Sequence, residues 1–180
     1  MTLIAQSPFE LDMLTRLFRD LKPERALEIG VWHGGTLHRW LQACPDVVAI
    51  DAQMLYPDMW GRWAEEAGAN LTLLHGSSAD PAIIAAARRR GPYGFVMVDA
   101  GHTYSEVQQD WLNYRPMVAE GGVMVFHDIQ PRPDYGVSQL WDEIKNETGA
   151  RTSEFFHKGG SFYSDGLTSG YDPGIGVVWL

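Results

Sequence analysis

Short apolar runs alternate with longer amphipathic segments along most of this chain. The runs at 26–30, 47–51, 71–74, 95–98 and 123–126 are mostly apolar and do not alternate in polarity, which is typical of strands buried on both faces of a sheet. The segments between them carry apolar residues at helical spacing. The pattern predicts an α/β fold, in which a mostly parallel sheet is covered by helices on both faces and is closed by further strands at 151–156 and 174–180.

The first helix has clear start and stop signals. Ser7 suits the N-cap position, Pro8 suits the first helical position, and Pro23 ends the segment. We expect this helix to cover one face or edge of the sheet with its apolar residues Leu11, Leu14, Leu17, Phe18 and Leu21.

Composition and charge narrow the class of protein. The 180 residues are 45% hydrophobic and 21% charged, which are globular values, and we expect a single domain spanning 1–180. The net charge of −9 argues against a nucleic-acid surface, which needs a basic field. Cys44 is the only cysteine, and the sequence has no signal peptide and no apolar run of roughly 18 residues. We therefore expect a cytoplasmic protein without a membrane partner.

Four side chains able to bind a metal or move a proton follow two of the predicted strands. Asp99 and His102 come after the strand at 95–98, and His127 and Asp128 come after the strand at 123–126. A right-handed crossover through the helical segment between them makes these strands parallel. Their carboxyl ends then lie at one edge of the sheet, where open α/β sheets bind ligands. We expect the four side chains to converge at that edge.

A glycine-rich turn at 30–36 joins the first strand to its helix. Glycines at Gly30 and Gly34 let the backbone approach a ligand that a Cβ would exclude. The next strand ends at Asp51, about 20 residues after Gly30, where a carboxylate can accept hydrogen bonds from both hydroxyls of a ribose. Together these features predict nucleoside binding, although each alone also occurs as a plain structural turn or a surface aspartate.

Four segments carry a resemblance to a known family: 28–36 (EIGVWHGGT), Asp51, 99–102 (DAGH) and 126–129 (FHDI). Together they resemble the class I S-adenosylmethionine (SAM)-dependent methyltransferases, and among these the small-molecule O-methyltransferases of the methyltransferase-24-like branch. The resemblance extends from about residue 26 to the final strand. It implies a Rossmann-like domain with a seven-stranded sheet of order 3-2-1-4-5-7-6, in which strand 7 is antiparallel.

The resemblance also implies roles for individual residues. The cofactor-binding positions of the family are matched by Glu28, Gly30, Gly34, Asp51, Ser77 and Ser78. The positions at which metal-dependent members bind magnesium are occupied by Asp99, His127 and Asp128. His102 matches the catalytic base of catechol O-methyltransferase-like enzymes.

Two departures from the family pattern leave alternatives open. The usual Asp-Gly-Asp-His motif is Asp-Ala-Gly-His at 99–102, and His127 stands where an acid often binds the metal. Magnesium prefers oxygen ligands, so manganese, iron or no metal remain open. For His127, a hydrogen bond to a ligand residue is as compatible with the sequence as ligation. Asp99 and Asp128 are also compatible with helix N-caps, because each lies between a strand and a turn.

These assignments predict a SAM-dependent enzyme that methylates a hydroxyl of a small molecule such as a phenol, sugar or polyketide. A divalent cation, Mg²⁺ or Mn²⁺, on the aspartates would favour ionisation of that hydroxyl, and an imidazole at 102 can accept its proton near neutral pH.

Two other function classes remain. One is a non-catalytic SAM-binding module. The other is a nicotinamide-dependent oxidoreductase, but the sequence lacks the Gly-x-Gly-x-x-Gly spacing and any Tyr-x-x-x-Lys pair. Homo-oligomer formation is left open, and the glycine-rich segment 157–173 is long enough for a lid.

Overall fold

The computed structural model describes residues 6–147, 149, 151–156 and 173–180. The segment expected to form a lid therefore lies, except for its last residue, outside the described residues. The elements follow in the order α1 (Pro8–Leu21), β1 (Ala26–Ile29), α2 (Gly35–Leu41), β2 (Asp46–Asp51), α3 (Pro57–Ala67), β3 (Asn70–His75), α4 (Pro81–Arg90), β4 (Tyr93–Val98), α5 (Tyr104–Tyr114), η1 (Arg115–Met117), β5 (Val118–His127), α6 (Val137–Asn146), β6 (Arg151–Phe155) and β7 (Ile175–Trp179).

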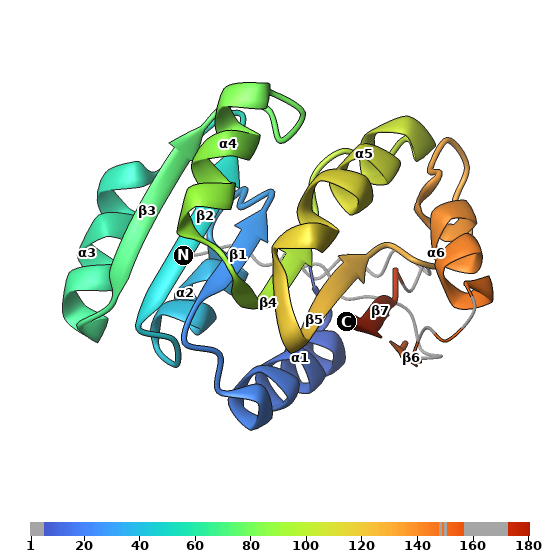
Figure 1. The fold of residues 1–180 in the computed structure, drawn as a ribbon. Coiled ribbons are helices and arrows are strands. Elements are labelled where there is room, and N and C mark those ends of the chain that lie inside the picture. Colours follow the sequence, from blue (N-terminus) through green and yellow to red (C-terminus); the bar gives the residue numbers. More distant parts are fainter. Residues whose placement is uncertain (1–5, 148, 150, 157–172) are drawn as a thin grey trace.

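The strands form one seven-stranded sheet of order β3-β2-β1-β4-β5-β7-β6. The strands β3, β2, β1, β4 and β5 are parallel, and β7 is antiparallel to both β5 and β6. Figure 1 shows β1 and β4 at the centre of the sheet, with the last two strands at one end. The order and the direction of β7 confirm the topology predicted from the sequence.

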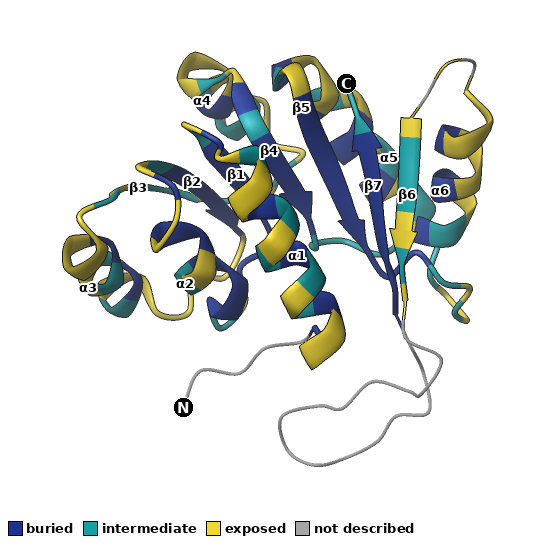
Figure 2. Cartoon of the chain, turned by 90° about the horizontal axis from the view of Figure 1, so that it is seen from below, coloured by how far each residue is buried: buried dark blue, intermediate teal, exposed yellow. Residues whose placement is uncertain are grey.

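Helices cover both faces of the sheet, as the apolar runs predicted. Figure 2 shows α1, α2 and α3 on one side of the row of strands and α4, α5 and α6 on the other. Two apolar clusters fill the space between the layers. One includes Phe18, Trp40 and Phe95 between α1, α2 and β4, where Phe18 stacks on Trp40 and meets Phe95 edge to face. The other includes Trp111, Phe126 and Trp141, which join α5, β5 and α6.

The helix starts follow from local hydrogen bonding. Ser7 caps α1 in a capping box with Glu10, since the Ser7 side chain accepts the Glu10 N–H and the Glu10 side chain accepts the Ser7 N–H. Asp80 caps α4, and Thr103 forms a capping box with Glu106 at the start of α5. No described helix is long and apolar enough to cross a membrane.

The strand β7 packs against α6 through a glycine. A Cβ added at Gly176 would lie 2.8 Å from three ring atoms of Trp141, a side chain that is almost fully buried. Trp141 also donates from its indole nitrogen to Glu154 Oε1 on β6 at 2.6 Å, so the ring is fixed from two sides. The glycine at 176 is therefore required for the close approach of helix and strand.

We expect Gly176→Ala to lower the free energy of unfolding by about 1–3 kcal/mol, because the added methyl group overpacks a ring that cannot move away. Denaturant unfolding checks this. Gly61→Ala is the matched control: Gly61 lies inside α3 with nothing within 4 Å of an added Cβ, so this change should stabilise the fold by about 0.5–1 kcal/mol. Wild-type stability in Gly176→Ala would contradict the packing argument.

Candidate functional site

The carboxyl edge of the sheet brings together the four side chains expected there. Asp99 follows the last residue of β4, His127 ends β5, and Asp128 follows it. His102 lies in the short turn between β4 and α5. The backbone places Asp99 beside β1, because its N–H donates to Ile29 O at 2.8 Å.

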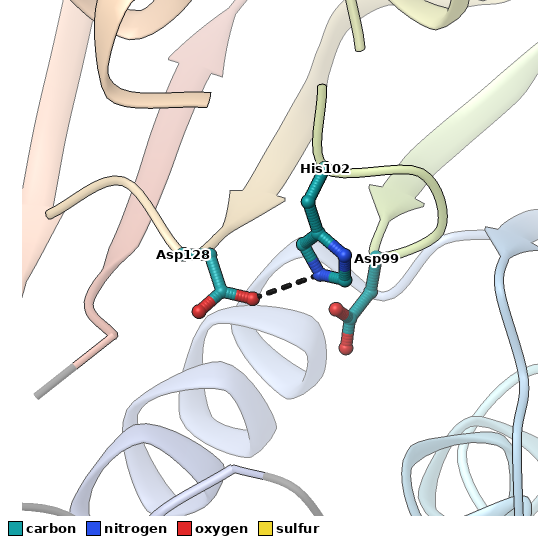
Figure 3. Close-up of side chains that lie close together, drawn as sticks. All are labelled: Asp99, His102 and Asp128. Atoms are coloured by element: carbon teal, nitrogen blue, oxygen red, sulfur yellow. Dashed lines mark ion pairs between the residues drawn. The ribbon is translucent and has the colours of Figure 1, made fainter. Parts of the chain in front are cut away.

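His102 lies against the two aspartates. Its Nε2 is 3.1 Å from Asp128 Oδ2, and Figure 3 shows the ring between Asp128 and Asp99. One ligand atom from each of Asp99, His102 and Asp128 can be chosen so that all lie within 4.8 Å of one another, which is close enough to hold one metal ion. The His102 ring also stacks on Tyr135, with ring centroids 4.3 Å apart, and Arg132 lies over that same tyrosine.

His127 lies behind the carboxylates. Its Nδ1 is 3.2 Å from both Asp99 Oδ1 and Asp128 Oδ2, and only 5% of its side chain is exposed. Its Nε2 has no hydrogen-bond partner among the described residues and lies 3.9 Å from Glu10 Oε2. A metal ion would therefore reach the imidazole of His127 less easily than that of His102, whose side chain is 34% exposed.

The charges at this edge shift each other's protonation. Burial lowers the pKa of His127, but the charge of Asp99, the contacts of Nδ1 with Asp128 and Asp99 and the nearby carboxylate of Glu10 raise it well above its ordinary value. Burial raises the pKa of Asp128, while hydrogen bonds from His102 and His127 outweigh that effect and leave it lowered. The structure therefore favours a charged imidazolium at 127 beside an ionised Asp128.

The N-cap alternative for the two aspartates is excluded. The helix after β4 is capped by Thr103, and the helix after β5 begins after Gly136. Asp128 instead has a φ of 60°, a conformation that is uncommon for a residue other than glycine and that clusters at functional sites.

The glycine turn after β1 meets Asp99 directly. Gly30 has a φ of 87°, and an added Cβ would overlap the carbonyl oxygen of Asp99. Gly30 lines the cavity beside the site, but Gly34 and Glu28 do not. A Cβ at Gly34 would lie 2.5 Å from Trp60 Nε1, so a glycine at this position allows the Trp60 side chain of α3 to pack against the turn.

Glu28 is fully buried beneath the turn. It accepts a hydrogen bond from the hydroxyl of Thr36, a residue that does line the cavity. Burial raises the pKa of Glu28 well above its ordinary value, and the nearby charges of Asp99 and Asp51 raise it further. The shift favours the protonated form of Glu28, whose contact with the turn segment is the hydrogen bond from Thr36.

Asp51 joins two turns at the end of β2. Its Oδ2 accepts the N–H groups of Val31 and Trp32 at 2.8 and 2.9 Å, and its Oδ1 accepts those of Gln53 and Met54 at 2.7 and 3.1 Å. Burial raises the pKa of this carboxyl, but the four backbone hydrogen bonds prevail and lower it. The carboxylate borders the cavity in its ionised form, and its two oxygens already accept two backbone N–H groups each.

Ser77 and Ser78 line the same cavity from the turn after β3. The turn is tied to α5, because Tyr114 Oη donates to Ser78 O at 2.8 Å. Asp110 on α5 is almost fully buried, and its Oδ1 has no hydrogen-bond partner among the described residues. Burial raises the pKa of Asp110 to about 6, although a hydrogen bond with the Ser78 side chain offsets part of this shift.

One cavity of about 570 Å³ unites these groups. Its lining runs from Asp51 and Ser77 past Gly30 to the cluster of Asp99, His102 and Asp128. The sequence interpretation missed several residues that line it, namely Gln6, Thr36, Glu106, Gln109, Arg132, Tyr135 and Pro173. Gln6 and Pro173 lie far from any motif in sequence. Arg132 and Tyr135 follow the FHDI segment closely, which is the one signal that pointed toward them.

Comparison with known proteins agrees with this arrangement. A family model described as a methyltransferase domain matches residues 27–129, which is more than half of the chain. No curated protein sequence gives a significant match.

Solved structures share the fold at low sequence identity. An O-methyltransferase from Bacillus cereus in complex with SAH has a TM-score of 0.73 at 14% identity, over 97% of this chain and 81% of that chain. The O-methyltransferase TomG from Streptomyces achromogenes, involved in tomaymycin synthesis and in complex with SAM, has a TM-score of 0.75 at 17% identity, over 98% and 81%. MycE, from the mycinamycin biosynthetic pathway and in complex with Mg, SAH and mycinamycin VI, has a TM-score of 0.58 at 23% identity, over 75% of this chain and 39% of that chain.

The buried acid at 110 gives a prediction about stability and pH. In the unfolded chain Asp110 loses its proton near pH 4, whereas the folded protein retains it up to about pH 6. The free energy of unfolding therefore decreases as the pH rises from about 4 to about 6, and the full loss of stability is present above pH 6. Asp110→Asn removes the penalty and should raise the free energy of unfolding by up to about 3 kcal/mol at pH 7–8, with little gain at pH 4.

Urea unfolding at a series of pH values measures this effect. Asp12→Asn is the control, because Asp12 is an exposed residue paired with Arg16 and should change stability by less than about 0.5 kcal/mol at any pH. A gain in the Asp110→Asn variant that is equal at pH 4 and pH 8 would show that the acid does not titrate as described.

Proposed function

Because the chain belongs to the methyltransferase-domain family of class I SAM-dependent methyltransferases, we propose that it transfers a methyl group from SAM to a hydroxyl of a small-molecule acceptor. The observation that carries this proposal is the position of His102 on Asp128 at one end of a cavity whose other end is formed by Gly30, Asp51 and Ser77. The cavity volume, about 570 Å³, falls within the range of small-molecule sites.

The cofactor end of the cavity suits a nucleoside. SAM supplies a methyl group already activated on its sulfonium. The turn at Gly30 gives close backbone approach, and Ser77 and Ser78 offer hydroxyls toward a base. A ribose hydroxyl would hydrogen-bond the ionised Asp51 by displacing or sharing one of the four backbone N–H groups that its oxygens accept. Structures that share this fold and are in complex with SAM or SAH support SAM as the cofactor.

The acceptor end contains the proton-accepting group. We assign this role to His102, because in the tautomer that donates from Nε2 to Asp128 the other ring nitrogen, Nδ1, carries a free lone pair. Asp128 then fixes the ring from one side and Tyr135 stacks against its face. In this proposal His127 is not a metal ligand; it is a hydrogen-bonding partner of the two aspartates that would bind the cation.

The residues at this end also fit a divalent cation. Three carboxylates, Glu10, Asp99 and Asp128, surround the imidazolium of His127. Arg132 Nη1 lies 4.0 Å from Asp128 Oδ1, so two cations face three anions and the site retains excess negative charge. Asp99 and Asp128 would bind the cation, and their oxygen donors suit Mg²⁺ or Mn²⁺. A bound cation supplies a Lewis acid to the acceptor hydroxyl. The Mg in the complex of MycE supports this part of the proposal.

The acceptor end does not favour one class of alcohol over another. Arg132 and Tyr135 give it one cationic and one aromatic group, and phenols, sugars and polyketides carry hydroxyls that fit. The complex of MycE with mycinamycin VI favours a hydroxyl-bearing natural product as the first acceptor to test.

The cation part predicts an effect of chelation. Release of S-adenosylhomocysteine from SAM, with a panel of phenols, sugars and macrolides, should fall on addition of EDTA and recover with Mg²⁺ or Mn²⁺. Asp99→Asn and Asp128→Asn should each reproduce the loss, because each removes a charged cation ligand, while calorimetry shows unchanged SAM binding. Turnover that is insensitive to EDTA would limit the aspartates to positioning.

The base has its own prediction. His102→Ala should lower turnover by about 10²–10⁴-fold, the usual contribution of a positioned general base, with SAM and Mn²⁺ binding retained. If His102→Ala instead loses Mn²⁺ binding, the imidazole is a cation ligand and the proton acceptor lies elsewhere. SAM binding without turnover on any acceptor would favour a non-catalytic SAM-binding module.

A further inference from the structure

The segment before and at the start of α1 reaches the acceptor end of the cavity. The family match begins at residue 27, so Gln6 and Glu10 lie outside it. Both side chains are nevertheless buried against the site, and Gln6 lines the cavity. Their contacts go to the residues proposed to bind the cation or to the histidine between them.

Gln6 acts on Asp99. Its Nε2 donates to Asp99 Oδ2 at 2.6 Å, and the other oxygen of the same carboxylate, Oδ1, lies 3.2 Å from His127 Nδ1. A partner on each oxygen fixes the rotation of the carboxylate about its own axis. Each oxygen retains a lone pair, so the carboxylate can still bind a cation.

Glu10 acts on the segment and on His127. Its Oε2 accepts the N–H of Ser7 at 2.8 Å and lies 3.9 Å from His127 Nε2, while its Oε1 accepts the N–H of Gly174 at 2.8 Å. A capping box alone would admit glutamine at this position. Two backbone donors on two different oxygens require a carboxylate, because a glutamine would present its NH₂ group to one of them.

We propose that Gln6 and Glu10 are positioning residues for the cation and acceptor site: Gln6 fixes the carboxylate of Asp99, and the buried carboxylate of Glu10, 3.9 Å from Nε2, attracts the ring of His127 that lies between Asp99 and Asp128. The inference rests on the proposed function, since it concerns the groups that would bind the cation. Groups that orient metal ligands typically change metal affinity by about 10–100-fold when they are removed. Gln6 and Glu10 thus extend the site to a part of the chain that the family match does not include.

The test measures Mn²⁺ binding directly, by calorimetry and by the loss of the free-Mn²⁺ EPR signal, on the full chain. Gln6→Met keeps the length of the side chain and removes the donor to Asp99, so the Mn²⁺ dissociation constant should rise about 10–100-fold. SAM affinity and the thermal midpoint should remain at wild-type values. Glu10→Gln retains the capping box and should also weaken Mn²⁺ binding, with wild-type SAM affinity.

Gln139→Met is the matched control. Gln139 donates from Nε2 to Glu143 Oε1 on the exposed side of α6, so the same substitution removes the same kind of hydrogen bond away from the cavity. Mn²⁺ binding should be unchanged. Wild-type Mn²⁺ affinity in both Gln6→Met and Glu10→Gln overturns the inference alone. Absence of Mn²⁺ binding by the wild-type protein overturns both the inference and the cation part of the proposed function.

Discussion

The parallel pairing of β4 with β1 and β5 is the constraint on which the site depends. Val98 pairs with Ile29 on one side and with Phe126 on the other, so three neighbouring strands end at the same level. Everything that follows these residues in sequence must leave the sheet at one edge. The glycine turn after β1, Asp99 and the His127–Asp128 pair meet there because of backbone register, before any side-chain interaction is formed.

Register brings like charges together, and the fold must then compensate for them. Asp99 and Asp128 face one another across the ends of β4 and β5, and His127 lies between them as a counter-ion that solvent hardly reaches. Removing one member of such a buried group leaves the others unpaired at a cost of about 3–5 kcal/mol. Asp99, His127 and Asp128 thus stabilise one another. A cation bound by the two carboxylates would neutralise their remaining negative charge.

The sheet order was implied by the family resemblance. The sequence pattern itself was sufficient for the helix faces and for the convergence of four side chains, because these follow from local periodicity and from the handedness of parallel crossovers. It was insufficient wherever a contact joins distant segments. No periodic pattern in the sequence signals the contact of Gly34 with Trp60 or the approach of Gln6 to Asp99. The same is true of the four hydrogen bonds that Asp51 accepts from backbone N–H groups. Gly34 shows the limit most clearly, since a glycine that fits a cofactor motif is also explained by the helix packed against it.

The hydrogen bond from Gly174 to Glu10 spans 164 residues of sequence. During synthesis, at roughly 5–20 residues per second, the two partners emerge roughly 10–30 s apart. Helix α1 and most of the parallel strands can form in that interval, but the buried carboxylate at the start of α1 has its second donor only when β7 is made. The contacts of Glu10 are therefore completed only at the end of synthesis, after the glycine turn and the residues around Asp99 and Asp128 have been made.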